Sequence, residues 1–227
     1  MGKAIADYHK NKKANKLRVL SPMFDEDEMP VSHLFRTYTQ MPKLERRALD
    51  LAKGRVLDVG AGAGCHSLVL QQRGLDVTAI DISPLSVQTM QQRGIANAIE
   101  KNFFDVDNQY DTILMLMNGI GIVGSLKRLP DLFHHLDNVL APDGQLLCDS
   151  TDICYLFEDE DGVIELPEGD YYGEQTFHMQ YGDVVGEPFP WLYVDADTLQ
   201  LVASQCGYKV EIVLQGKHYD YLARITR

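Results

Sequence analysis

Hydrophobic and polar positions alternate along the middle of the chain in a pattern that predicts strands separated by helices. Short apolar runs at residues 55–60, 76–82 and 110–117 are rich in β-branched or large aliphatic side chains, as buried strands are. A weaker run at residues 96–102 and another at 144–150 predict two further strands. Because strands buried on both faces of a sheet read as continuous apolar runs, this pattern predicts a parallel sheet with helices on both faces.

The segments between these runs carry helix signals. Residues 64–73 place Leu68, Val69 and Gln72 at helical spacing, and Gly74 ends the helix. Ser83 and Pro84 suit the cap and first turn of the next helix. A third helix has an apolar face made by spacings of three and four, at Leu126, Leu129, Phe133, Leu136 and Leu140.

The C-terminal part of the chain has a different pattern. Residues 174–182 and 189–194 read as two strands around a Gly/Pro turn, and residues 195–206 read as a helix. Residues 208–214 and 218–225 alternate around Gly216, which predicts an antiparallel hairpin. An open parallel sheet that closes with an antiparallel hairpin is thus expected.

We expect two domains. Residues 1–53 read as an N-terminal helical cap with an acidic loop between Pro22 and Pro30, and residues 54–227 carry the sheet. Residues 151–194 are an insertion that joins the fifth strand to the last helix. They are expected to form a lid and an acceptor pocket. The alternative is a solvated acidic loop followed by a structural hairpin.

Composition narrows the class of partner. The formal net charge is −12, from 33 acidic and 21 basic residues, so a nucleic-acid partner is not expected because phosphate binding needs a basic face. The first residues lack the apolar region of a signal peptide, and no run is long enough for a membrane span. The four cysteines show no metal-ligand spacing. We expect a cytoplasmic protein with reduced thiols and no metal site.

The stretch VLDVGAGAG joins the first strand of the sheet to the following helix. Its glycines, at positions 60, 62 and 64, depart from the dinucleotide pattern G-x-G-x-x-G, because Cys65 stands where the third glycine should be. Asp58 would repel a pyrophosphate but would favour a cationic ligand such as S-adenosylmethionine, which has no phosphate. The alternative is that the glycines only make a tight strand–helix turn.

Two further acids follow strands of the sheet. Asp81 ends the second strand, where a carboxylate can bind both ribose hydroxyls of a nucleoside. Asp105 follows the third strand, where it could bond an adenine amino group while Phe104 contacts the ring. The structural alternatives are an exposed strand end for Asp81 and a turn residue for Asp105.

The combination D-V-G-A-G-A-G, A-I-D-I-S, F-F-D and L-A-P-D-G resembles the class I S-adenosylmethionine-dependent methyltransferases over residues 55–150. The closing hairpin extends the resemblance toward Arg227. The resemblance implies a doubly wound, Rossmann-like α/β fold with strand order 3-2-1-4-5-7-6 and an antiparallel strand 7. It also implies S-adenosylmethionine as donor and S-adenosylhomocysteine as product.

The resemblance further implies the residues of the donor site. Asp58, Gly60, Ala61, Gly62 and Gly64 would line the methionine and ribose portions. Asp81 would bind the ribose, beside Ile82, while Phe104 and Asp105 would bracket the adenine. Met117, Asn118 and Gly119 would form a wall near the methyl group. From the N-terminal segment HLFRTYT, Tyr38 or a neighbour is expected to reach the donor.

One departure from the family bears on the acceptor. Many methyltransferases of nucleic acids and of protein nitrogen atoms carry (N/D/S)-P-P-(Y/F/W) after the fourth strand. This chain has Met-Asn-Gly-Ile at residues 117–120 instead. A small-molecule acceptor is therefore expected. The alternatives are a methyltransferase for RNA or protein and a nicotinamide-dependent oxidoreductase built on the same sheet.

No residue stands out as a general base. A base is needed only if the acceptor must lose a proton during the attack. Tyr171 and His218 are the candidates for a polar side chain facing the acceptor, although packing or surface roles are the alternative for both.

Overall fold

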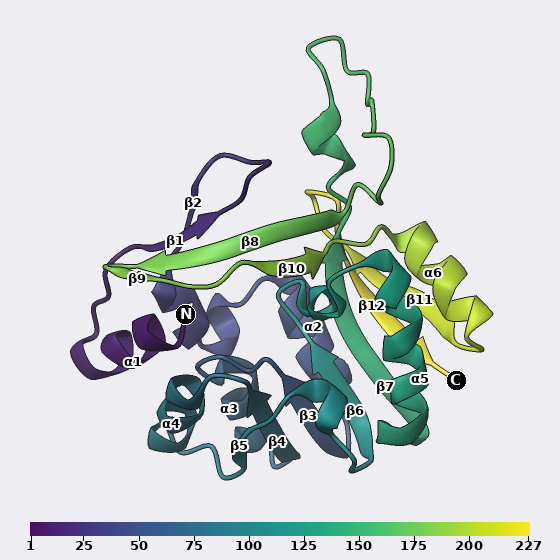
Figure 1. Cartoon of the computed structure of the whole chain (residues 1–227). Coiled ribbons are helices and arrows are strands. Elements are labelled where there is room, and N and C mark those ends of the chain that lie inside the picture. Colours follow the sequence, from purple (N-terminus) through teal and green to yellow (C-terminus); the bar gives the residue numbers. More distant parts are fainter.

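A seven-stranded sheet forms the centre of the molecule in the computed structural model, which describes residues 1–227 (Figure 1). Its strands are β3 (Arg55–Val59), β4 (Asp76–Asp81), β5 (Ala98–Glu100), β6 (Tyr110–Met115), β7 (Leu140–Thr151), β11 (Lys209–Gln215) and β12 (Asp220–Thr226). Their order is β11-β12-β7-β6-β3-β4-β5, and β12 alone runs antiparallel to its neighbours. Counted along the chain within this sheet, the order is 3-2-1-4-5-7-6, which confirms the expected topology.

Helices cover both faces of this sheet because side chains alternate between the faces along each strand. On one face, Val56 and Leu147 pack with α2 and α3. On the other face, Leu57 and Cys148 pack with α5 and α6. The helices are α1 (Gly2–Asn11), α2 (Lys43–Leu51), α3 (Cys65–Gln72), α4 (Pro84–Gln92), α5 (Leu129–Val139) and α6 (Ala196–Gln205).

Several helix ends follow the sequence signals. The Ser83 hydroxyl accepts the backbone N–H of Ser86 at the start of α4. Asp195 accepts the backbone N–H of Thr198 at the start of α6. Short 3₁₀ turns fill most of the remaining connections: η1 (Val31–Phe35), η2 (Tyr38–Gln40), η3 (Phe103–Asp105), η4 (Gly119–Val123), η5 (Leu126–Arg128) and η6 (Cys154–Phe157).

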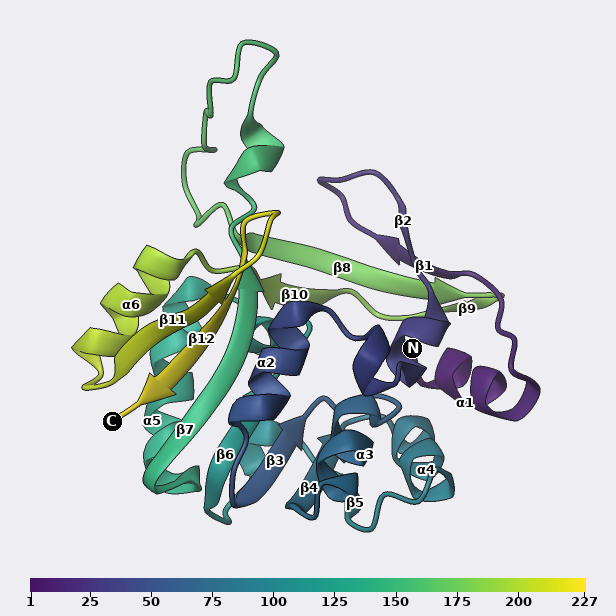
Figure 2. The ribbon, with the colours of Figure 1, turned by 180° about the vertical axis from the view of Figure 1, so that it is seen from behind.

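A second, antiparallel sheet lies over the carboxyl ends of the parallel strands. It consists of β1 (Leu17–Leu20), β2 (Asp27–Met29), β8 (Glu174–Tyr181), β9 (Val184–Val185) and β10 (Phe189–Leu192). Its order is β10-β8-β1-β2, with β9 paired to β8. Figures 1 and 2 show β8 extending above the main sheet, from the end of β7 to the region of α1. We call this sheet the roof sheet.

The roof sheet corrects the expectation for the N-terminal segment. Residues 1–53 were expected to be helical, but β1 and β2 form a hairpin whose first strand pairs with β8. Leu17, in this hairpin, is fully buried beside Tyr181 of β8. The strand therefore forms because it packs against a distant segment, and local β-propensity alone does not predict it. The expected cap (1–53) and the expected insertion (151–194) therefore share one sheet.

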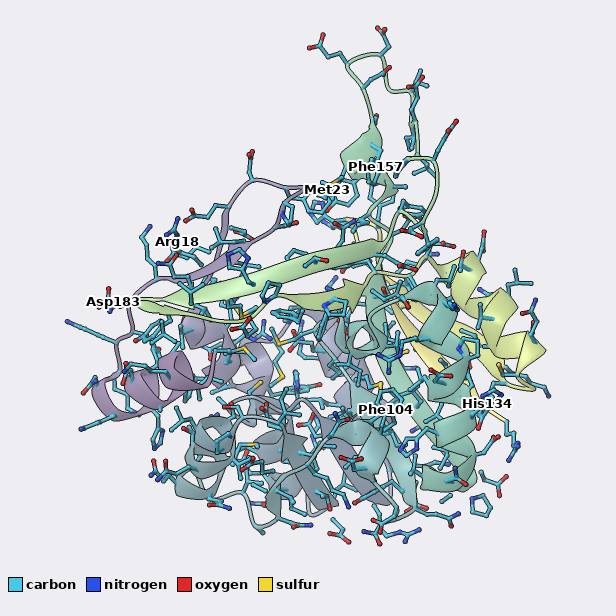
Figure 3. The ribbon with its side chains drawn as sticks, in the orientation of Figure 1. Arg18, Met23, Phe104, His134, Phe157 and Asp183 are labelled. Atoms are coloured by element: carbon cyan, nitrogen blue, oxygen red, sulfur yellow. The ribbon has the colours of Figure 1, made fainter.

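An acidic arm at residues 158–170 projects away from the body between η6 and β8 (Figure 2). Its only internal strand contact is an isolated bridge between Glu158 and Ile164. The arm begins after Phe157, which Figure 3 labels at its base. No helix of the molecule is both long and apolar enough to cross a membrane.

Candidate functional site

The glycine loop between β3 and α3 brings the backbone into conformations that other residues rarely adopt. Gly60 and Gly64 have φ values of +65° and +76°. A Cβ atom on Gly64 would lie 2.1 Å from a methyl carbon of Ile95, so this glycine is required for packing against the neighbouring segment. A Cβ atom on Gly60 would meet nothing within 4 Å, so the loop borders open space there.

Asp81 connects this loop to the end of β4. Its side chain is 5% exposed and accepts the N–H of Gly62 at 2.9 Å and the N–H of Ser83 at 2.8 Å. Burial raises the pKa of Asp81, and the two backbone donors oppose that rise. The next residue, Ile82, is 73% exposed despite its apolar side chain. A carboxylate beside an exposed aliphatic group at a strand end suits a ribose and its base.

Asp58 lies beneath the loop rather than at its surface. It is 2% exposed, and the Ser67 hydroxyl of α3 donates a hydrogen bond to it at 2.5 Å. Burial raises the pKa of Asp58, while the nearby His66 lowers it. The carboxylate therefore anchors α3 to β3, and its charge would act on a ligand through space rather than by contact.

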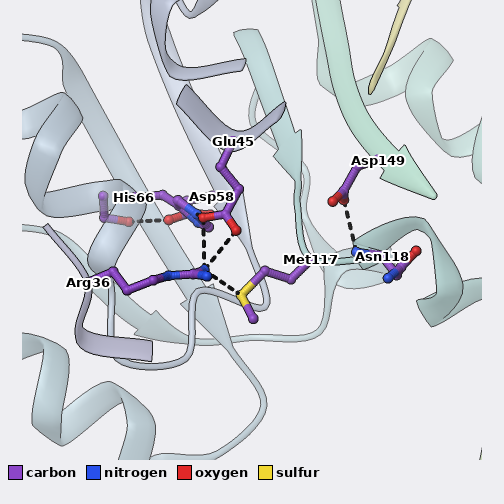
Figure 4. A network of polar contacts seen from close by, with 8 residues as sticks. Arg36, Glu45, Asp58, His66, Met117, Asn118 and Asp149 are labelled. Carbon is purple, nitrogen blue, oxygen red and sulfur yellow. Dashed lines mark hydrogen bonds and ion pairs between the residues drawn. The ribbon is translucent and has the colours of Figure 1, made fainter. Parts of the chain in front are cut away.

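A buried cluster of charged side chains beside the loop was not found from the sequence. Nη2 of Arg36 donates to both carboxylate oxygens of Glu45, at 2.7 and 2.9 Å. Nε2 of His66 lies 2.7 Å from the Glu45 carboxylate (Figure 4). The three residues come from the segment after η1, from α2 and from α3, so only the tertiary structure brings them together.

Acidic neighbours favour the charged form of His66 in this cluster. Burial by itself would lower the pKa of His66, but Cys65, Glu45 and Asp58 outweigh it and hold the pKa well above its usual value. Nη2 of Arg36 also lies 3.5 Å from the Met117 sulfur. Nε of Arg36 is buried and has no hydrogen-bond partner in the chain. A buried guanidinium donor without a partner suits an anionic group of a ligand.

The turn after β6 is strained at two successive positions. Met117 and Asn118 have φ values of 64° and 55°, in the left-handed region that residues other than glycine rarely occupy. The backbone N–H of Asn118 donates to the Asp149 carboxylate at 2.9 Å. The side-chain Oδ1 of Asn118 accepts a hydrogen bond from the Thr151 hydroxyl at 3.0 Å. Such strain gathers at functional sites because surrounding contacts must hold it in place.

Asp149, the acid that holds this turn, was also not singled out from the sequence. It is half-buried near the carboxyl end of β7. Burial raises its pKa to about 7; the N–H of Asn118 and His66 oppose the rise, and Glu45 adds to it. No residue pattern in the sequence marks it, because its environment is made by α2, α3 and the strained turn.

Tyr38 and Phe104, both expected at the donor, make contacts within the protein, and Asp105, also expected there, is exposed. The Tyr38 hydroxyl donates to the Asp50 carboxylate at 2.8 and 2.9 Å, and its ring lies under Arg73. Phe104 packs against Phe103 and His135, beside α5 (Figure 3). Asp105 is exposed at the end of η3. From the HLFRTYT segment, Arg36 is the residue that joins the buried charged cluster beside the glycine loop.

Of the two candidates for a polar side chain facing the acceptor, Tyr171 has partners within the protein and His218 is exposed. The Tyr171 hydroxyl donates to the Asp195 carboxylate at 2.5 Å and accepts the Asp195 N–H at 2.9 Å. This places Tyr171 at the cap of α6, where burial raises its pKa. His218 is exposed in the turn between β11 and β12.

The underside of the roof sheet faces the strained turn with aromatic side chains. A Cβ atom on Gly121 of η4 would lie 2.1 Å from Nε1 of Trp191, so Trp191 points toward the main sheet. Residues two apart on a strand, and cross-strand partners, share a face, so Phe189 and its partner Phe177 point the same way. Gln175, opposite Trp191, is 5% exposed and its Oε1 has no partner.

The four cysteines are free, and no three or more His, Cys, Asp or Glu side chains are placed to hold a metal ion.

Comparison with known proteins places the chain among methyltransferases. A family model for a methyltransferase domain matches residues 32–211. The crystal structure of an S-adenosylmethionine-dependent methyltransferase from Bacteroides fragilis, in complex with S-adenosylhomocysteine, is 55% identical. It superposes with a TM-score of 0.94 over 99% of this chain and 93% of that one.

Two curated relatives are more distant. An uncharacterized methyltransferase from Staphylococcus carnosus is 28% identical over 78% of this chain and 80% of its own length. A ubiquinone biosynthesis O-methyltransferase from Xanthomonas oryzae pv. oryzae is 40% identical over 55 residues, which are 24% of this chain and 23% of that protein.

Proposed function

The chain belongs to the methyltransferase-domain family and is an S-adenosylmethionine-dependent methyltransferase, and from this premise we propose that it methylates a small molecule bound beneath the roof sheet. S-adenosylmethionine is the cofactor and S-adenosylhomocysteine the product. The donor supplies a methyl group on a sulfonium, which is already activated for displacement. The protein's task is therefore to hold and align the acceptor and to exclude water.

The residues around the glycine loop fit this donor. The partnerless Nε of Arg36 suits the carboxylate of the methionine portion. The open space at Gly60 allows a ligand to approach the backbone, and Asp81 suits the ribose hydroxyls. The exposed side chain of Ile82 suits the adenine ring. We therefore propose that Arg36, Gly60, Asp81 and Ile82 bind the donor, along its length from methionine to adenine.

The aromatic underside of the roof sheet carries the proposal for the acceptor. Small-molecule sites are lined by apolar and aromatic side chains with a few polar groups that fix orientation. Phe177, Phe189 and Trp191 supply the apolar surface. The buried Oε1 of Gln175 supplies an unused hydrogen-bond acceptor. A net charge of −12 argues against an RNA acceptor, because RNA binding needs a basic surface.

A transfer experiment separates acceptor classes. The purified protein is incubated with S-adenosylmethionine labelled in its methyl group and a cell extract, which is then divided by ultrafiltration. Label in the filtrate supports a small-molecule acceptor. Label in retained RNA or protein would contradict the proposal. Calorimetry with S-adenosylhomocysteine is the control for an intact donor site, and mixing with NADH should leave NADH fluorescence unchanged.

A further inference from the structure

Asp149 points toward the site from the face of the main sheet that α2 covers. Leu147, two residues earlier on β7, packs in the core beneath α2, and residues two apart on a strand share a face. Figure 4 shows the Asp149 carboxylate directed toward the backbone of Asn118, next to Met117. The carboxylate therefore lies at the carboxyl end of β7, next to the turn that is expected to border the methyl group.

Only one side of the Asp149 carboxylate is used by the protein. Oδ1 accepts the N–H of Asn118 at 2.9 Å, which holds the strained turn. The other oxygen accepts no hydrogen bond from the chain, and it is not among the buried atoms that lack a partner. This oxygen is therefore free to receive a proton or a hydrogen bond from a ligand.

The charged groups around Asp149 leave it without a direct cationic partner. The Asp149 carboxylate is repelled by Glu45 of α2 and attracted by His66 of α3. Glu45 and His66 are hydrogen-bonded to each other and make no hydrogen bond to Asp149. Arg36, from the segment after η1, is likewise paired with Glu45. Burial raises the pKa of Asp149 to about 7, and a general base works best when its pKa lies near the working pH.

Resting on the proposed function, we propose that Asp149 is the catalytic residue that accepts the proton of a hydroxyl or amine acceptor. As the acceptor's oxygen or nitrogen forms a bond to the methyl carbon, the carbon–sulfur bond breaks and its electron pair stays on sulfur. The proton of the acceptor passes to the free oxygen of Asp149. The products are the methylated acceptor, S-adenosylhomocysteine and protonated Asp149, which then releases its proton to water.

Asp149→Asn tests this role, because asparagine can still accept the N–H of Asn118 but is not a base. The control is Asp143→Asn, at an exposed site near the start of the same strand. Both variants should bind S-adenosylhomocysteine within about twofold of the wild type. Methyl transfer to phenol or benzylamine probes should fall about 10²- to 10⁴-fold in Asp149→Asn alone, the usual contribution of a general base. Transfer to thiophenol, which is already a thiolate at neutral pH, should be unchanged.

A direct titration of Asp149 tests whether its pKa suits a base, even if none of the probes is methylated. Carboxyl carbon NMR of the protein with S-adenosylhomocysteine bound should show one aspartate that titrates near neutral pH and is absent from Asp149→Asn. An Asp149 that titrates near pH 4 would overturn the proposal. So would equal phenol transfer by the variant, or a donor affinity more than tenfold weaker in Asp149→Asn, which would place this carboxylate on the donor's ammonium group. If Asp149→Asn does not fold, the same titration on Asp149→Glu replaces it. Failure of donor binding by the wild type would instead contradict the proposed function.

Discussion

Arg36 is paired with Glu45 through Nη2 alone, which leaves Nε buried without a partner. The Glu45 carboxylate holds the guanidinium in place, and Nε remains available to donate a hydrogen bond to a second carboxylate. This arrangement suits the proposed recognition of the donor's amino-acid carboxylate, since a preorganised fork costs less entropy to bind.

Replacing Arg36 by methionine should weaken S-adenosylhomocysteine binding by about 10- to 100-fold, because a hydrogen bond to a charged group contributes roughly 1.5–3 kcal/mol. Methylthioadenosine lacks the amino-acid portion, so its affinity should be unchanged. Calorimetry with both ligands measures the difference. Arg47→Met, at an exposed position of α2, is the control. An equal loss for both ligands would mean that Arg36 supports the fold rather than the carboxylate.

Asp81→Ala should weaken donor binding by about 1–3 kcal/mol, since it removes the partner of the Gly62 and Ser83 N–H groups as well as the proposed ribose contact. Calorimetry with S-adenosylhomocysteine measures the loss. Asp76→Ala, at the exposed start of the same strand, should bind normally. Unchanged affinity in Asp81→Ala would show that this carboxylate does not face the ribose.

Gly121→Ala should displace Trp191, because the added Cβ would lie 2.1 Å from the indole nitrogen. Trp191 is the only tryptophan, so its fluorescence spectrum reports the displacement directly. Overpacking of this kind costs about 1–3 kcal/mol of stability. Gly74→Ala, where nothing lies within 4 Å, should destabilise through backbone strain but leave the spectrum unchanged. An unshifted spectrum in Gly121→Ala would contradict the packing of the roof sheet on η4.

The stability of the protein should fall as pH rises above about 6.5, the ordinary pKa of histidine. The pKa of His66 is raised in the folded state, so over this range the folded protein binds more protons than the unfolded chain, and the unfolding free energy decreases with pH. Asp149, with a pKa of about 7, adds a slope of the same sign at lower pH. Urea unfolding of wild type and His66→Gln across this range should show a flatter profile for the variant. Parallel profiles would mean that His66 is neutral in the fold.

Features carried by local sequence were predicted well. Strands β3, β4 and β6 are short apolar runs, and the Ser83 cap is a local signal that the structure confirms. The order of the sheet followed from the family resemblance, and the closing hairpin was visible as alternation around Gly216. The hairpin of β1 and β2 was not predicted from the sequence, because both strands are short and the further partner of β1, strand β8, lies far along the chain.

The sequence by itself determined the class of cofactor. The glycine loop and Asp81 follow two successive parallel strands, and the carboxyl ends of neighbouring parallel strands lie side by side. Only the tertiary structure decided which charged groups gather near the strained turn after β6. Arg36, Glu45 and His66 come from three separate segments, and the raised pKa of Asp149 comes from its burial, with a smaller contribution from Glu45. Burial and long-range pairing depend on how distant segments pack, and that information is spread over the whole chain rather than held in any one motif.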